Sequence, residues 1–175
     1  MKRAVFLDRD GVITPHQNAP RTLAEMQIDP DAPAVLARLK AAGFLLLVVT
    51  NQPDVARGVT PKGEVEAMHA ALCRSLPLDS CYVCYHDDGD NCACRKPRPG
   101  MLHDAAAEHG IDLAASFLIG DRWRDVDAGA AAGCRTVWID RGYRERPPDH
   151  APDARATTLA EAAQWILKQA APARP

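Results

Sequence analysis

The sequence predicts an α/β protein built on a doubly wound, Rossmann-like parallel sheet. Short apolar runs alternate with amphipathic helical patterns along the whole chain, as expected when helices connect parallel strands. The longest run, Phe44–Val49, is typical of a strand that helices cover on both faces. The 175 residues suffice for one domain, which we expect at 1–170, with a flexible tail at 171–175. No insertion large enough for a cap domain interrupts the pattern.

Each element has its own local signal. Gly43 and Gly110 end two helical patterns, and Pro61, with Thr60 as its cap, begins another. The prolines between 147 and 152 predict a surface loop. In chain order the expected strands are 4–7, 44–50, 80–85, 116–120 and 135–139, and the expected helices are 32–42, 61–76, 99–109, 126–132 and 159–170.

The composition excludes several classes of protein. A formal net charge of −2 gives no reason to expect nucleic acid or an anionic membrane as a partner. The longest apolar run is too short to cross a bilayer, and the first residues lead into a strand without the pattern of a signal peptide. We therefore expect a cytoplasmic protein, and a monomer.

Polar residues follow three predicted strands at their carboxyl ends, where ligands bind in sheets of this kind. A buried strand that ends on two carboxylates, Asp8 and Asp10, needs a compensating charge. Mg²⁺ supplies one, because it takes carboxylate oxygens and keeps positions open for phosphate. Asp8 is then a candidate nucleophile and Asp10 a candidate acid and base. Taken singly, each of these groups of polar residues at a strand end could equally be a solvated turn or a helix cap.

The residues Asp8-x-Asp10-Gly11, Thr50, Lys96 and Gly120-Asp121-x₃-Asp125 resemble, in this order, the four motifs of the haloacid dehalogenase-like (HAD) phosphatases. The resemblance spans most of the chain. It implies phosphoryl transfer through an aspartyl-phosphate on Asp8, while Asp10 protonates the leaving alkoxide and then activates water. It also implies that Mg²⁺ is held by Asp8, the backbone carbonyl of Asp10, and Asp121.

The same resemblance assigns supporting roles. Lys96 offsets the repulsion between the nucleophilic carboxylate and the phosphate. Thr50, with the backbone amides of Asn51 and Gln52, hydrogen-bonds the phosphoryl oxygens. Asp125 is expected to orient Lys96 or the ligands of the metal.

Four candidate zinc ligands lie close together in the sequence: Cys84, His86, Cys92 and Cys94. Three thiolates and one imidazole suit a closed, tetrahedral, structural Zn²⁺, and the segment 87–91 between them has no apolar residue to pack. Cys81 is a rival ligand, although on a strand it would face away from Cys84. A group of free buried cysteines is the alternative, and Cys73 and Cys134 are expected in the core.

This cysteine loop, followed by Arg95-Lys96-Pro97 and Pro99-Gly100-Met101, resembles a zinc-loop subgroup of the HAD phosphatases. Members of the subgroup act on a heptose bisphosphate or on histidinol phosphate. By this resemblance the candidate substrate-binding residues are Asn51, Gln52, Arg57, Arg95, Arg122 and, in the first loop, His16.

We accordingly expect a phosphoric monoester hydrolase that removes the C7 phosphate of D-glycero-D-manno-heptose 1,7-bisphosphate in heptose biosynthesis. The five-residue spacer between His86 and Cys92 instead favours histidinol phosphate, and another small sugar phosphate remains open. A non-catalytic, zinc-organised binding module is the alternative of another class. In such a module, part of the set of catalytic residues should be missing.

Overall fold

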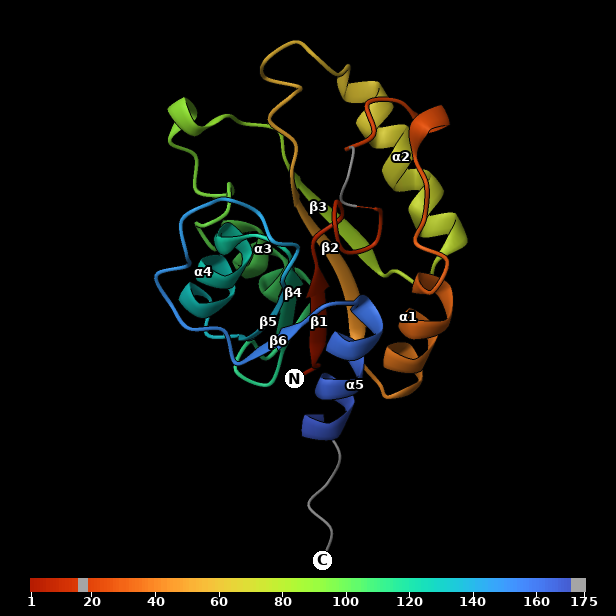
Figure 1. Cartoon of the computed structure of the whole chain (residues 1–175), viewed down its shortest axis with the longest axis vertical. Helices are drawn as coiled ribbons and strands as arrows, with labels where there is room; N and C mark the ends of the chain where they lie inside the picture. Colours follow the sequence, from red (N-terminus) through yellow and green to blue (C-terminus); the bar gives the residue numbers. More distant parts are fainter. Residues whose placement is uncertain (16–18, 171–175) are drawn as a thin grey trace, which may run out of the picture.

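The computed structural model describes residues 1–15 and 19–170 and consists of one parallel sheet between two layers of helices (Figure 1). The predicted tail at 171–175 lies outside the described residues. The strand order is β3-β2-β1-β4-β5-β6, which confirms the doubly wound parallel sheet. The strands are β1 (Ala4–Leu7), β2 (Leu45–Asn51), β3 (Ser80–Cys84), β4 (Phe117–Gly120), β5 (Arg135–Ile139) and β6 (Ala154–Ala156).

The helices divide between the two faces of the sheet. On one face lie α1 (Ala32–Ala41), α2 (Lys62–Ser75) and α5 (Leu159–Ala170). The other face carries α3 (Gly100–His109) and α4 (Trp123–Ala131). Two short 3₁₀ turns, η1 (Leu23–Glu25) and η2 (Asp88–Asp90), lie in the connecting loops.

The central strands contribute to two separate cores, which explains why they are apolar at consecutive positions. In β1, Val5 and Leu7 pack under α1 and α5, whereas Ala4 and Phe6 pack on the opposite face with α3. All four side chains are fully buried. A strand covered on both faces has no solvent side, so the usual alternation with polar residues is lost.

One strand was missed, and several boundaries differ from the sequence-based expectation, most of them by one residue. Strand β6 was not predicted, because three residues after a proline-rich loop carry no strand pattern. Helix α4 begins at Trp123 rather than at 126, because the carboxylate of Asp125 accepts a hydrogen bond from the Arg122 amide and stabilises an earlier first turn. Helix α2 begins at Lys62, with Pro61 rather than Thr60 at its cap.

One cysteine was also wrongly assigned to the core. Cys73 on α2 is exposed, whereas Cys134 is buried as expected. On a helix that covers the sheet with one face, Cys73 belongs to the outer face. Among the helices of the described part of the chain, none is both long and apolar enough to cross a membrane.

Candidate active site

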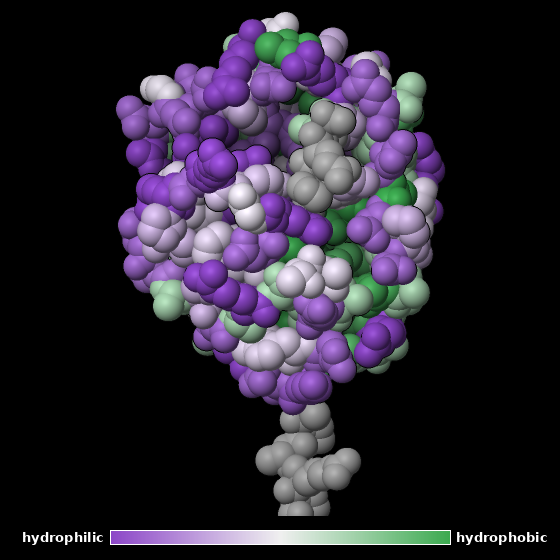
Figure 2. Space-filling model, viewed as in Figure 1, coloured by the Kyte–Doolittle hydropathy of each residue, from purple (hydrophilic) through white to green (hydrophobic). Residues whose placement is uncertain are grey.

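The carboxyl ends of the central strands bring the predicted catalytic residues together. Asp8 directly follows β1 and Asp121 directly follows β4, and these paired strands flank the point where the strand order reverses. Thr50 lies at the end of β2. They line one cavity of about 580 Å³, together with Asp10 and Lys96. Over these strand ends, the molecular surface is hollowed and hydrophilic (Figure 2). Ligands bind at such a reversal in open α/β sheets.

Lys96 connects two of the carboxylates. Its ammonium nitrogen lies 3.0 Å from Asp8 Oδ1 and 2.5 Å from Asp125 Oδ1, and it donates to the carbonyl of Val49 at 2.7 Å. Although burial lowers the pKa of Lys96, the two carboxylates raise it well above its usual value. The side chain of Asn51 donates to the Lys96 carbonyl and accepts from its amide, which fixes the position of the lysine backbone.

The side chains of Asp8, Asp121 and Asp125 form an acidic group whose oxygens lie within 4.8 Å of one another. Burial raises the pKa of Asp8 to about 6, although the Lys96 ammonium opposes the shift. Burial, and then the charges of Asp8 and Asp125, raise the pKa of Asp121 to about 8. Tyr143 donates to Asp121 Oδ2 at 2.7 Å, but within the described residues no hydrogen-bond partner reaches the buried Oδ1. A bare carboxylate oxygen beside two further carboxylates suits a divalent cation.

Gly11 keeps this acidic group compact. Its φ of +83° is favourable only for glycine, and a Cβ there would lie 1.9 Å from Asp121 Oδ2. The glycine of the first motif therefore lets the chain after β1 approach the end of β4.

Asp10 lies in the same cavity but is not part of the acidic group. Its carboxylate accepts two hydrogen bonds from Arg9, one from Thr14 and one from the Gln52 side chain. Although burial favours its protonated form, the Arg9 guanidinium lowers the pKa of Asp10. Its side chain is thus held beside the acidic group. The backbone carbonyl expected to bind Mg²⁺ remains a prediction.

The structure corrects one expected phosphate contact. The backbone amide of Gln52 donates to the carbonyl of Cys84 at 2.7 Å, so it does not face the cavity as a free donor. This bond continues the pairing of β2 with β3 by one residue. The Gln52 side chain instead donates to the hydroxyl of Thr50 at 3.0 Å, which leaves the Thr50 hydroxyl hydrogen to be donated elsewhere.

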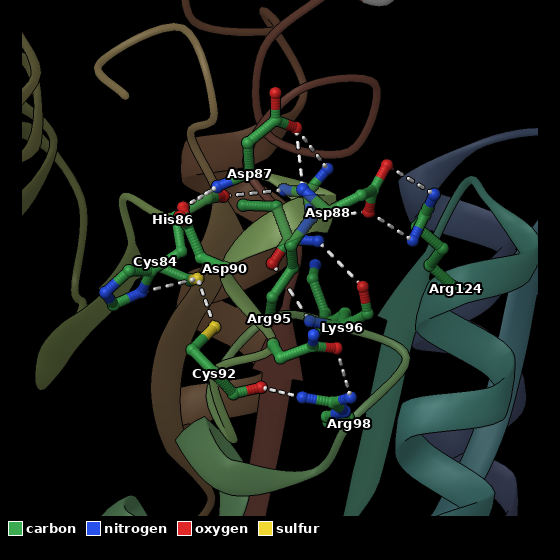
Figure 3. Close-up of polar contacts among 12 residues, drawn as sticks. Cys84, His86, Asp87, Asp88, Asp90, Cys92, Arg95, Lys96, Arg98 and Arg124 are labelled. Carbon is green, nitrogen blue, oxygen red and sulfur yellow. Dashed lines mark hydrogen bonds and ion pairs between the residues drawn. The ribbon is translucent and has the colours of Figure 1, made fainter. Parts of the chain in front are cut away.

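Arg57 and Arg95, two predicted substrate-binding residues, lie at the rim of the cavity, and both contact carboxylates of the cysteine loop. Arg57 donates to both oxygens of Asp87, each at 2.7 Å. Arg95 donates to Asp88 at 2.8 Å. Both pairs connect the rim to the segment between the predicted zinc ligands. Figure 3 shows Arg95 and Asp88.

Arg122, the third predicted arginine, also lines the cavity. It forms an ion pair with Glu145 and lies over the ring of Tyr143, 4.2 Å from its centroid. His16 lies outside the described residues.

The four predicted zinc ligands come together: Cys84, His86, Cys92 and Cys94. The three sulfurs are separated by 3.2–3.7 Å, and Nδ1 of the histidine lies 3.4 and 3.6 Å from two of them. Ligands 2.0–2.3 Å from a tetrahedral ion stand about 3.3–3.8 Å apart, so these four atoms could hold such an ion. Cys81 is not among them, and its sulfur lies 3.4 Å from that of Cys73.

Sequence reasoning missed several residues of this cavity. Arg124 and Asp88 both line it and contact each other. Arg124 stands inside the fourth motif, and its place in the first turn of α4, one residue before Asp125, was a signal that could have been used. Tyr143 and Glu145 lie in the irregular segment after β5, where no local pattern points to the site.

A parallel sheet with this acidic cluster and buried lysine at the carboxyl ends of its strands defines the class of HAD-like hydrolases. The family model of HAD-hydrolase-like proteins matches residues 93–162. A D-glycero-beta-D-manno-heptose-1,7-bisphosphate 7-phosphatase of Bordetella bronchiseptica is 35% identical over 80% of this chain and 82% of its own. That of Escherichia coli K12 is 34% identical over 98% and 97% of the two chains. The chain belongs to this family of HAD-like phosphatases.

Solved structures agree. The D,D-heptose 1,7-bisphosphate phosphatase of B. bronchiseptica, complexed with magnesium and phosphate, superposes with a TM-score of 0.82 at 31% identity. The match covers 95% of this chain and 99% of that one. A putative HAD-like phosphatase of Mesorhizobium loti has a TM-score of 0.80 at 26% identity and covers 99% and 90%.

Proposed function

We propose that this protein is a cytoplasmic, Mg²⁺-dependent phosphatase that hydrolyses the C7 phosphate of D-glycero-D-manno-heptose 1,7-bisphosphate. One observation carries the proposal most directly. At the ends of β1 and β4, Asp8 and Asp121 share a cavity with Lys96, and Asp121 Oδ1 is buried without a partner among the described residues. The substrate is taken from the names of the relatives.

The residues present fit a divalent cation. Asp8 and Asp121 would hold it with the backbone carbonyl of Asp10, and Asp125 would support the group through its contact with Lys96. When bound, Mg²⁺ offsets the charge of the carboxylates and of the phosphate that approaches them.

In the first chemical step, a carboxylate oxygen of Asp8 forms a bond to phosphorus while the bond from phosphorus to the C7 oxygen breaks. Asp10 gives a proton to that leaving oxygen. Lys96, 3.0 Å from Asp8, reduces the repulsion between the nucleophile and the phosphate. The hydroxyl of Thr50 donates to a phosphoryl oxygen.

In the second step, Asp10 takes a proton from water, and the water oxygen attacks the phosphorus of the aspartyl-phosphate. The bond from Asp8 to phosphorus breaks, inorganic phosphate leaves, and Asp10 is protonated again for the next cycle. Gln52 and Thr14 hold the carboxylate of Asp10 at the wall of the cavity throughout.

The cysteine cluster supports a structural Zn²⁺ with four protein ligands and no open position. Its place in the chain suggests its purpose, because Cys94 immediately precedes Arg95 and Lys96. Zn²⁺ would fix the loop that places the side chains of Arg95 and Lys96 at the cavity.

Turnover on two substrates tests the proposal. We would compare kcat/KM for heptose 1,7-bisphosphate and histidinol phosphate in the presence of Mg²⁺, with the Asp8→Asn variant as the blank. A clear preference for the heptose bisphosphate is the expected result. Preference for histidinol phosphate would contradict the proposed substrate, and phosphate release by Asp8→Asn would contradict the proposed chemistry.

A further inference from the structure

Two arginines from different parts of the chain share one carboxylate at the rim of the cavity. Nε of Arg95, on the cysteine loop, lies 2.8 Å from Asp88 Oδ1. Arg124, in the first turn of α4, contacts both oxygens of Asp88, at 3.1 and 3.2 Å. Figure 3 shows the two guanidinium groups on opposite sides of this carboxylate. All three residues line the cavity that contains Asp8.

At Asp88, two guanidinium groups face one carboxylate. Arg57 contacts Asp54 and both oxygens of Asp87. Arg95 and Arg124 share Asp88, and Arg95 reaches Asp87 only at 3.8 Å. Further anionic charge, such as that of a phosphate, would be attracted to this place.

The two arginines and the aspartate differ in how firmly they are held. The Arg95 side chain is only 10% exposed and also donates to the backbone carbonyl of His86. The Arg124 guanidinium lies over the Trp123 ring, 4.5 Å from its centroid. The Asp88 side chain, in contrast, is 56% exposed. Ion pairs this open to solvent contribute little, so a stronger anion can replace the carboxylate at small cost.

We infer that Arg95 and Arg124 form a fork for the second anionic group of the substrate, and that Asp88 is the internal anion which this group displaces. The inference rests on the proposed function, in which a bisphosphate is hydrolysed at one end only. While the C7 phosphate lies at Asp8, the distal C1 phosphate reaches the rim. Guanidinium groups bind phosphate oxygens in pairs, so two of them suit a phosphate dianion better than a single carboxylate.

Arg124 then determines specificity without taking part in the chemistry. It adds affinity for molecules that carry a second phosphate, and it adds none for a monophosphate. Asp88 has the opposite effect, because it competes with the second phosphate and leaves monophosphate binding unaffected. The two variants Arg124→Gln and Asp88→Asn should therefore change the same selectivity in opposite directions.

Binding in the inactive Asp8→Asn background tests this separately from turnover. Calorimetry would measure Kd for the heptose 1,7-bisphosphate and for the corresponding 7-phosphate. Adding Arg124→Gln should raise Kd for the bisphosphate about tenfold more than Kd for the monophosphate, as expected for the loss of about 1.4 kcal/mol. Adding Asp88→Asn should lower Kd for the bisphosphate selectively.

Arg98→Gln is the matched control. Arg98 donates to Cys92 and Asn91 of the same loop but does not line the catalytic cavity, so its loss should affect both ligands equally. If Arg124→Gln weakens both ligands equally, or neither, the fork is wrong. If Asp88→Asn fails to tighten the bisphosphate, the displacement is wrong. A wrong proposed function shows separately, as an intact enzyme that does not hydrolyse the bisphosphate.

Discussion

The guanidinium of Arg9 forms a two-point ion pair with the carboxylate of Asp10, with Nε–Oδ1 at 2.9 Å and Nη2–Oδ2 at 2.8 Å. Arg9 is fully buried, and its Nη2 also donates to the Gln52 side chain at 3.0 Å. Nε2 of His69 lies 3.5 Å from Nη1. Burial, and then the charge of Arg9, lower the pKa of His69 to about 4, so this histidine is neutral near pH 7. Residues whose identity the HAD motifs do not specify thus fix the proposed acid and base.

Loss of the Arg9 guanidinium should therefore affect both folding and activity. Arg9→Met leaves a largely buried carboxylate without its cation, and we expect the free energy of unfolding to fall by about 3 kcal/mol or more. Urea unfolding measures this loss. Arg9→Lys is the control, because it keeps the charge but not the two-point contact. Equal stability of Arg9→Met and the parent protein would contradict the importance of the pair.

Without a divalent cation, the stability of the protein should fall as pH rises. The folded state raises the pKa of Asp8 to about 6 and that of Asp121 to about 8, whereas both carboxyls titrate near 4 in an unfolded chain. The folded state then holds protons that the unfolded state has lost. The stability from these groups is present below about pH 4 and is lost as pH rises through about 6 and 8.

Thermal unfolding across this pH range, with EDTA or with Mg²⁺, measures the effect. We expect Tm to fall with pH in EDTA and the fall to be much smaller in Mg²⁺, because the cation compensates the carboxylates. Asp121→Asn, which removes one titrating group, should flatten the EDTA curve. A Tm that responds to Mg²⁺ equally in this variant and in the parent would argue against Asp121 as a ligand.

Removal of one thiol from the cysteine cluster should cost stability first and activity second. We expect Cys92→Ser to lower Tm, and to lower turnover by disordering the loop that carries Arg95 and Lys96. Cys73→Ser makes the same chemical change at an exposed cysteine outside the cluster, and it should leave both quantities unchanged. Full activity and unchanged Tm in Cys92→Ser would count against a structural zinc.

The sequence predicted those parts of the fold that depend on local patterns. Buried strands such as β1 and β2 are apolar throughout, and Gly110 ends α3 in the left-handed conformation. Strand β6 could not be found this way. It is short, and it is stabilised by pairing with β5 and by the Asp153 carboxylate, which accepts from the Thr136 amide across 17 residues of sequence. Such contacts carry no local signal.

The site shows the same division. Asp8, Thr50 and Asp121 could be predicted because each directly follows or ends an apolar strand in a parallel sheet, and such ends meet at one edge. The contacts between charged residues at the rim of the cavity could not be predicted in this way. Asp88 and Arg124 are 36 residues apart and meet where the cysteine loop contacts the first turn of α4. The expectation that the backbone amide of Gln52 binds phosphate was wrong, because the pairing of β2 with β3 continues one residue past the strand.

Asp8 is the proposed nucleophile, on which the whole reaction depends. Acid quenching of the enzyme during turnover, followed by mass spectrometry of the peptide that contains residue 8, tests it most directly. We expect the mass of one phosphoryl group on Asp8 of the parent enzyme, and neither this adduct nor phosphate release in Asp8→Asn. Appreciable phosphate release by Asp8→Asn, with no phosphorylated Asp8 in the parent enzyme, would contradict it.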